Sequence, residues 1–417
     1  MGNICVIGGG AAGLMAAYAA ANNGHNVILF EKNEKLGKKI YITGKGRCNF
    51  TNHVAPDDFL RNVVRGERFL RGSIYAFPPE KTLQFMEENG LNVKIERGNR
   101  AFPVSDHASD VTKTLEKACQ NAGVSIRLNE TVREIIIENS TTRDIIPMSR
   151  VVELVTNKRT YACDVAIVAT GGLSYPSTGS TGDGYVFAQT AGHTVTDLKC
   201  GLCGINTKGD FCAELQGLTL KNVTFCIKNG NKTVYEEFGE MLFTHFGVSG
   251  PIVLSASSII NRMQIKHLNA YIDLKPALDE NTLDKRLLRD FDVYKNKHIF
   301  NGLIDILPQK LIYCVLKHCN IPEAKPVNAI TKAERLLILR AIKQFPVCLQ
   351  DLRGFQEAII TSGGVTLSEI NPKTMESKKV SGLKFCGEVL DVDAFTGGFN
   401  MQIAFSTGFA AGNTIEI

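Results

Sequence analysis

Three glycines near the start of the chain, Gly8, Gly10 and Gly13, have a spacing that can bind a diphosphate. A Gly-x-Gly-x-x-Gly turn lets a strand pass sharply into a helix, lets a pyrophosphate approach the backbone, and lets the helix lie close to the strand. The N–H groups at the amino end of such a helix attract phosphate. Glu31, which follows in the next strand, can accept hydrogen bonds from a ribose. These residues predict a dinucleotide site.

The hydrophobic pattern around these residues predicts the elements that must hold them. An apolar run at 4–7 precedes the glycines, a helical pattern covers 11–21, and a second strand covers 27–30. A run over 164–172, apolar from 165 to 169 and closed by two glycines, is typical of a fully buried parallel strand. A further strand over 382–385 and a terminal helix over 400–411 bring the end of the chain to the same sheet.

The central part of the chain has a different pattern. Segments 222–228, 233–237 and 270–274 alternate like antiparallel strands, and 281–345 predicts amphipathic helices interrupted by prolines. A hairpin is also expected around 141–144. We therefore expect an α/β protein, with a discontinuous Rossmann-like domain, an inserted antiparallel β domain and a helical subdomain. The expected boundaries are 1–192 (first part of the nucleotide-binding domain), 193–276 (β domain), 277–347 (helical subdomain) and 348–417 (return through the β domain to the nucleotide-binding domain).

Further motifs occur in an order that resembles one group of flavoproteins. They lie at 43–52, 169–172, 182–184, 242–251, 361–365, 387–393 and 397–400. With the domain order, they resemble the BaiN/YhiN family of bacterial flavoproteins over essentially the whole chain. That family belongs to the two-dinucleotide-binding-domain flavoproteins and shares flavin motifs with fumarate reductases. The resemblance implies bound FAD, so that 1–192 and the end of the chain would form an FAD-binding domain.

The resemblance also implies which residues contact the FAD. The expected contacts lie in the glycine turn, at the ends of parallel strands, in the 43–52 segment and at the start of the terminal helix. They are Gly8, Gly10, Ala11, Ala12, Gly13, Glu31, Lys32, Gly46, Arg47, Cys48, Asn49, Val132, Thr170, Gly171, Gly387, Glu388, Asp391, Gly398, Asn400 and Met401. Free N–H groups of the terminal helix would favour negative charge on the flavin. No metal site is expected.

Reduction of a double bond needs a proton donor as well as a hydride. Cys48 is the first candidate and His245 the second, although Cys48 as a packed neighbour of the flavin and His245 as a loop residue are the plainer interpretations. We expect an FAD-dependent oxidoreductase that reduces a conjugated C=C bond of a small hydrophobic substrate, such as a bile-acid-like enone held between the two domains. Because the glycine motif occurs once, the electron source stays open between transient NAD(P)H binding and a partner protein.

The distribution of charge leaves other functions open. The net charge is +5, and residues 280–343 alone carry 12 Lys/Arg against 7 Asp/Glu. A helix over 61–71 would place Arg61, Arg65, Arg68 and Arg71 on one face, where they could bind RNA phosphates or form a solvated surface. A dihydrouridine synthase acting on 23S ribosomal RNA is therefore the alternative, and a small-amine (aminoketone) oxidase is a further one.

Composition bounds the cellular environment. The chain is 44% hydrophobic and 21% charged, as expected of a globular protein, and its apolar stretch at 11–21 is too short to cross a bilayer. Twelve cysteines at scattered spacings are typical of thiols in a reducing compartment. We expect a cytoplasmic protein without membrane association. The sequence does not indicate an oligomeric state.

Overall fold

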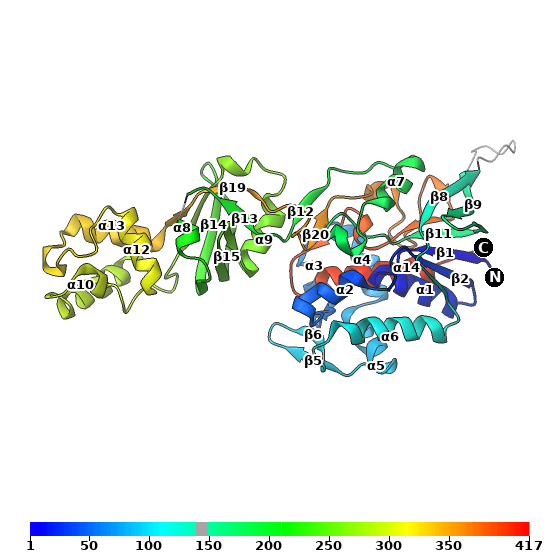
Figure 1. Cartoon of the computed structure of the whole chain (residues 1–417), viewed down its shortest axis with the longest axis horizontal. Coiled ribbons are helices and arrows are strands. Elements are labelled where there is room, and N and C mark those ends of the chain that lie inside the picture. The colour runs from blue at the N-terminus through cyan, green and yellow to red at the C-terminus, as the bar shows by residue number, and fades with distance from the viewer. Residues whose placement is uncertain (139–148, 210, 417) are drawn as a thin grey trace. The chain divides into compact units, whose positions relative to one another are not determined.

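The computed structural model of the chain describes residues 1–138, 149–209 and 211–416. The hairpin expected around 141–144 lies outside them. Contacts divide the chain into two units, which we call unit 1 (Met1–Cys200 with Phe355–Ile417) and unit 2 (Gly201–Gly354) (Figure 1). Unit 1 contains both ends of the chain, which confirms the expected discontinuous architecture. The finer division of the insertion at residue 276 and the other boundaries given above stay predictions.

Unit 1 is built on a five-stranded parallel sheet in the order β22-β11-β1-β2-β7. The strands are β1 (Asn3–Ile7), β2 (Asn26–Glu31), β7 (Ser125–Leu128), β11 (Val165–Val168) and β22 (Leu383–Phe385). The carboxyl ends of parallel strands meet at one edge, so the loops that follow β1, β2, β11 and β22 converge there. The Rossmann-like fold expected from the sequence is confirmed.

Two helices beside this sheet, α1 (Ala11–Asn22) and α14 (Phe399–Asn413), pack closely because both carry small residues (Figure 1). A Cβ on Gly408 would lie 2.3 Å from the carbonyl oxygen of Ala12, and a Cβ on Gly412 would lie 2.2 Å from that of Ala16. The start and the end of the chain are thus joined by a contact that no larger side chain permits.

The remaining elements of unit 1 surround this core. The helices are α2 (Lys38–Ile42), α3 (Pro56–Leu60), α4 (Glu67–Ala76), α5 (Pro79–Glu88), α6 (Ala108–Asn121) and α7 (Asp183–Thr190). The strands are β3 (Thr51–Asn52), β4 (Val63–Arg65), β5 (Val93–Glu96), β6 (Arg100–Pro103), β8 (Val132–Glu138), β9 (Ser149–Thr156), β10 (Thr160–Ala162), β20 (Ile360–Ser362), β21 (Val380–Ser381) and β23 (Asp393–Ala394).

The expectation of one helix carrying four arginines is wrong. Arg61 follows the last residue of α3, Arg65 lies in β4, and only Arg68 and Arg71 lie in α4. The helical pattern is interrupted because β4 pairs with β23 and because Gly66 adopts φ +81° just before α4. The four side chains therefore do not form a stripe.

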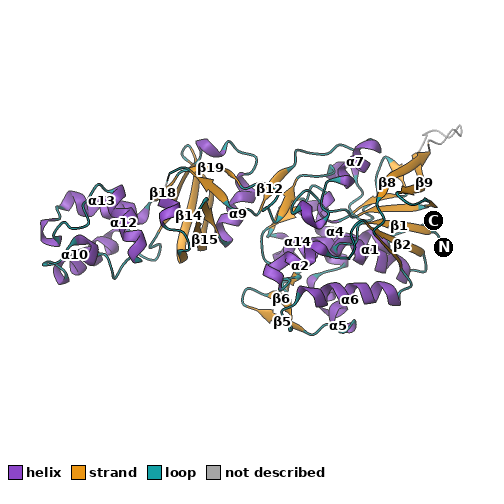
Figure 2. Ribbon diagram, viewed as in Figure 1, coloured by secondary structure: helices purple, strands orange, loops and turns teal. Residues whose placement is uncertain are grey.

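Unit 2 combines an antiparallel sheet with a group of helices, as expected. The sheet has the order β18-β17-β14-β15-β16-β13-β19, and Figure 2 shows α10, α12 and α13 grouped together beside it. The strands are β13 (Ile205–Thr207), β14 (Thr219–Asn229), β15 (Lys232–Thr244), β16 (Gly247–Ser249), β17 (Asn269–Asp273), β18 (Phe345–Val347) and β19 (Leu349–Leu352). The helices are α8 (Phe211–Glu214), α9 (Pro251–Ile260), α10 (Glu280–Val293), α11 (Ile299–Gly302), α12 (Gln309–His318) and α13 (Lys332–Lys343).

Among the described residues, no helix combines the length and the apolar character that a bilayer crossing requires.

Candidate FAD site

The three glycines after β1 have distinct environments. Gly8 adopts φ +107°, and a Cβ on it would lie 2.6 Å from the carbonyl oxygen of Ala169. A Cβ on Gly13 would lie 1.9 Å from the carbonyl oxygen of Gly8, so this glycine lets α1 approach the strand. A Cβ on Gly10, by contrast, would meet nothing within 4 Å. Gly8 and Gly13 therefore serve packing, whereas Gly10 leaves space beside the backbone.

The helix that begins at this turn offers N–H groups for an anion. Gly10 is the N-cap of α1, and no side chain of the described residues caps the helix there. The first N–H groups of a helix lack intrahelical partners, and the helix dipole favours negative charge at this end. Ala11 and Ala12, both nearly buried, form the first turn. This turn fits a pyrophosphate.

Two charged residues follow at the end of β2. The Glu31 carboxylate is buried and accepts hydrogen bonds from the N–H groups of Gly9 (2.9 Å) and Asn33 (2.8 Å). The Lys32 ammonium contacts the carboxylate of Asp183 at 2.7 Å. Glu31 thus lies beside the glycine turn, as the sequence predicts. Asp183 was not among the predicted contacts, although it lies in the Gly-Asp-Gly motif at 182–184.

Glu388 is brought to the same edge of the sheet. Its carboxylate accepts hydrogen bonds from the Ser174 hydroxyl (2.8 Å) and the Thr361 N–H (2.6 Å) and forms an ion pair with Lys39 (2.6 Å). The preceding Gly387 has φ +76°, and a Cβ on it would lie 2.7 Å from the Cβ of Ala12. Glu388 therefore joins its own segment to those of Lys39, Ser174 and Thr361. No local sequence pattern predicts its ion pair with Lys39.

Three buried polar atoms at the site have no hydrogen-bond partner within the described part of the chain. They are Thr170 Oγ1, Tyr185 OH and Asn49 Oδ1. An unpaired buried polar group costs about 1–3 kcal/mol, so such atoms in a native protein call for a ligand or water. Thr170 and the adjacent Gly171 (φ +74°) lie in the loop directly after β11, at the strand end that the sequence predicts. Tyr185 was missed, because nothing in the sequence places its hydroxyl near Gly172.

The start of α14 faces the segment around Asn49. Gly398 adopts φ +96°, and a Cβ on it would lie 2.9 Å from Asn49 Oδ1. No side chain of the described residues caps α14. The Asn400 side chain turns back onto the preceding loop, accepting from the Ala394 N–H (3.0 Å) and donating to the Ala394 carbonyl (2.7 Å). Met401 follows, partly buried. Free N–H groups and an unpaired acceptor thus meet here, which fits a ring that carries both C=O and N–H groups.

Cys48 is completely buried. It has φ +59°, and its N–H donates to the Thr43 carbonyl at 2.9 Å. Burial raises the pKa of the Cys48 thiol to about 12. The thiol therefore keeps its proton at neutral pH and is not prepared to act as a nucleophile.

The Arg47 side chain is engaged by two neighbouring strands. Its guanidinium donates to the Asp106 carboxylate (2.8 Å) and bonds to Glu96, and it lies 4.3 Å from the centre of the Phe102 ring. Gly46, just before it, adopts φ +87°. The Arg47 guanidinium thus already has two carboxylate partners within the protein.

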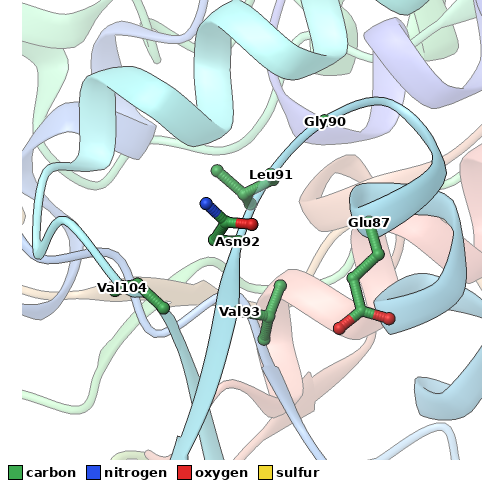
Figure 3. A pocket seen from close by; sticks show the side chains of 6 residues that line it. All are labelled: Glu87, Gly90, Leu91, Asn92, Val93 and Val104. Carbon is green, nitrogen blue, oxygen red and sulfur yellow. The ribbon is translucent and has the colours of Figure 1, made fainter.

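The remaining predicted residues lie in other elements. Val132 is buried at the start of β8, and Asp391 accepts a hydrogen bond from the Thr196 hydroxyl at 3.1 Å. His245 is exposed on the turn between β15 and β16 in unit 2. A surface pocket in unit 1 (Figure 3) contains no predicted residue; it is lined by Glu87, Gly90, Leu91, Asn92, Val93 and Val104.

Comparison with known proteins agrees with this geometry. Residues 2–414 match the family described as the HI0933-like protein Rossmann domain. The chain belongs to this family. It is 31% identical to a 3-dehydro-bile acid delta(4,6)-reductase of Clostridium scindens, over 99% of this chain and 98% of that protein. It is also 30% identical to a ribosomal RNA dihydrouridine synthase of Escherichia coli, over 97% and 96%.

A solved structure shares the fold. The 3-ketosteroid-delta4-(5alpha)-dehydrogenase of Rhodococcus jostii matches with a TM-score of 0.54 at 15% identity, over 99% of this chain and 96% of that one. The family and its relatives identify the chain as an FAD-dependent oxidoreductase. The open backbone at Gly10, the two uncapped helices and the unpaired polar atoms fit FAD.

Proposed function

We propose that this oxidoreductase reduces a conjugated C=C bond of a small hydrophobic substrate, with a bile-acid-like enone as the first candidate. The full-length similarity to the Clostridium scindens reductase carries the proposal, because it covers both units and not only the nucleotide-binding elements. FAD would be held by predicted residues of unit 1, with Gly10 and α1 at the pyrophosphate and Asn49 and α14 at the ring. Tyr185 is added to that set.

The division of chemistry follows from this arrangement. When bound and reduced, FAD would supply hydride chemistry for one carbon of the double bond, and the residues named above would hold it. The other carbon needs a proton, and Cys48 stays the first candidate donor because it lies beside Asn49 in the same loop. Its burial and its pKa of about 12 make the thiol a weak acid in the protein without substrate. Transient NAD(P)H is proposed as the electron donor. Anaerobic titration with NADH and NADPH, followed at the flavin absorbance, tests this step separately from substrate reduction.

The substrate test uses the same absorbance. Protein reduced anaerobically is mixed with a panel of enones that includes oxo-bile acids, and reoxidation of the flavin is followed. We expect rapid reoxidation by at least one enone and recovery of its saturated product. No reoxidation above the oxygen background across the panel would refute the proposed substrate class while leaving FAD binding intact.

Cys48→Ala tests the proton donor. We expect this variant to retain FAD and to turn over about a hundredfold more slowly, as is typical of losing a general acid. Cys119→Ala is the matched control, since burial also raises the pKa of that thiol to about 12 and it lies in α6, where it donates to the Leu14 carbonyl (3.2 Å). Equal turnover in the two variants would show that Cys48 is not the proton donor.

A second candidate is dihydrouridine synthesis in ribosomal RNA, because relatives so named in Escherichia coli and Haemophilus influenzae are each 30% identical over nearly the whole chain. Several cations that motivated it are, however, paired within the protein: Arg65 with Asp393 (2.8 Å), Arg335 with Asp284 (2.7 Å) and Lys343 with Asp273 (2.6 Å). Such pairs offer less charge to phosphate, which favours the small substrate. Mapping dihydrouridine in ribosomal RNA from a deletion strain distinguishes the two functions. Loss of a dihydrouridine would favour RNA as the substrate.

A further inference from the structure

The loop that carries Cys48 and Asn49 has an unusual backbone. Gly44, Lys45, Gly46 and Cys48 all adopt positive φ, at 59°, 57°, 87° and 59°. Lys45 and Cys48 have a Cβ, for which the left-handed region is unfavourable. Lys45 is exposed, so burial of its side chain does not compensate for this conformation. Contacts elsewhere must therefore hold the loop in place.

One of these contacts is made by the Arg47 side chain. Its guanidinium bonds to Asp106 (2.8 Å) and to Glu96, and it lies over the Phe102 ring. Lys94 approaches the same Asp106 carboxylate at 2.7 Å. A planar guanidinium with two carboxylate partners fixes orientation better than a single charge does. Arg47 thus ties the middle of the strained loop to β5 and to the turn after β6.

The far end of the loop is tied to α14. The Thr51 hydroxyl and Gln402 Oε1 lie 2.6 Å apart, and Asn52 Nδ2 donates to the Gly397 carbonyl at 3.0 Å. Between these two anchors lies Asn49, with its buried, unpaired Oδ1 beside Gly398. The position of this acceptor therefore follows the conformation of the loop.

We infer that Arg47 is a positioning residue of the FAD site: it clamps the left-handed loop to β5 and the β6 turn so that Asn49 presents its carboxamide oxygen at the start of α14. Its guanidinium does not contact the cofactor. This assignment differs from the direct FAD contact expected from the sequence. It rests on FAD binding and is independent of which substrate the enzyme reduces.

The experiment compares FAD dissociation constants and flavin absorption spectra of the full-length protein and four variants. Arg47→Gln should weaken FAD binding about tenfold, the value of one charged hydrogen bond, and shift the flavin spectrum. Lys45→Gly alone should bind FAD at least as well as the wild type, since glycine tolerates positive φ. Added to Arg47→Gln, it should restore affinity about threefold, because the loop then needs less support.

The control is Arg335→Gln, which removes another bidentate pair, with Asp284, from unit 2. It should leave FAD affinity and spectrum unchanged even if it lowers the melting temperature. Wild-type affinity and spectrum in Arg47→Gln would overturn the inference. If Arg47→Gln binds FAD weakly and the added Lys45→Gly change restores no affinity, the inference is also overturned. That result would favour a direct contact between Arg47 and FAD. Should Arg47→Gln fail to fold, Arg47→Lys, which keeps the charge but loses the fork, takes its place with the same outcomes.

Discussion

Two helices of unit 2 begin differently from the two helices that meet at the candidate site in unit 1. In unit 2, Asp279 caps α10 by accepting from the Thr282 N–H (2.6 Å), and Thr331 and Glu334 form a reciprocal capping box at α13. In unit 1, the N-cap residues of α1 and α14 are Gly10 and Gly398, and no described side chain caps either helix. Unit 2 therefore satisfies the amino ends of its two longest helices with its own side chains, whereas the amino ends of α1 and α14 stay without a side-chain cap, which fits the proposed FAD contacts.

The largest expected effect is at Gly10. Gly10→Val should weaken FAD binding roughly a hundredfold, about 2.7 kcal/mol, because the new side chain occupies the space that the pyrophosphate needs. The protein should still fold, since a Cβ there meets nothing within 4 Å and the backbone φ is −86°. FAD content after purification and the melting temperature without FAD measure the two effects.

Gly354→Val is the matched control, because a Cβ on that glycine also meets nothing within 4 Å. It should retain FAD. Full FAD content in Gly10→Val would contradict this account. It would show that FAD binding does not require the open space beside the Gly10 backbone.

A smaller effect is expected in acid, from a polar cluster in unit 1. His193 Nδ1 lies 3.0 Å from Glu369 Oε2, and its Nε2 lies 2.7 Å from the Ser377 hydroxyl. Burial lowers the pKa of His193. Burial alone would raise the pKa of Glu369, but hydrogen bonds from Lys379, Thr194 and His193 lower it to about 2.

The unfolded chain therefore takes up both protons at higher pH than the folded chain does. Stability should fall as the pH drops below about 6.5, the ordinary His value, and fall further from about 4.5 towards 2 as Glu369 titrates. The melting temperature of Glu369→Gln should be lower at pH 7 and change less between pH 5 and pH 3. An unchanged slope in the variant would contradict this assignment.

The smallest effect is expected in unit 2. Thr331→Ala removes the hydroxyl of the capping box at α13 and should cost about 1 kcal/mol of unfolding free energy, whereas Thr331→Ser should cost less. Neither change should alter FAD affinity. Chemical denaturation and FAD titration measure both quantities. A loss of FAD in Thr331→Ala would show that the helix ends of unit 2 also serve the cofactor.

The sequence predicted the elements whose patterns are local. The strands around Ile4 and Val165 and the terminal helix were found because apolar runs and glycines mark them directly. The arginine helix was wrong because Gly66 and the pairing of β4 with β23, a strand over 300 residues away, override helical spacing. The Lys39–Glu388 pair and the Tyr185 hydroxyl could not be found, since only the folded chain brings them to the site. The structure brings the predicted glycine, Glu31, Asn49, Thr170 and Glu388 positions to one unit and leaves His245 in the other.

The central claim is that unit 1 binds FAD through uncapped helix ends and an open glycine backbone. FAD stoichiometry of the purified protein, with an FAD titration followed by melting temperature, tests it most directly. One FAD per chain, or a clear rise in melting temperature with added FAD, is the predicted result. A colourless protein that neither binds added FAD nor melts at a higher temperature would contradict it.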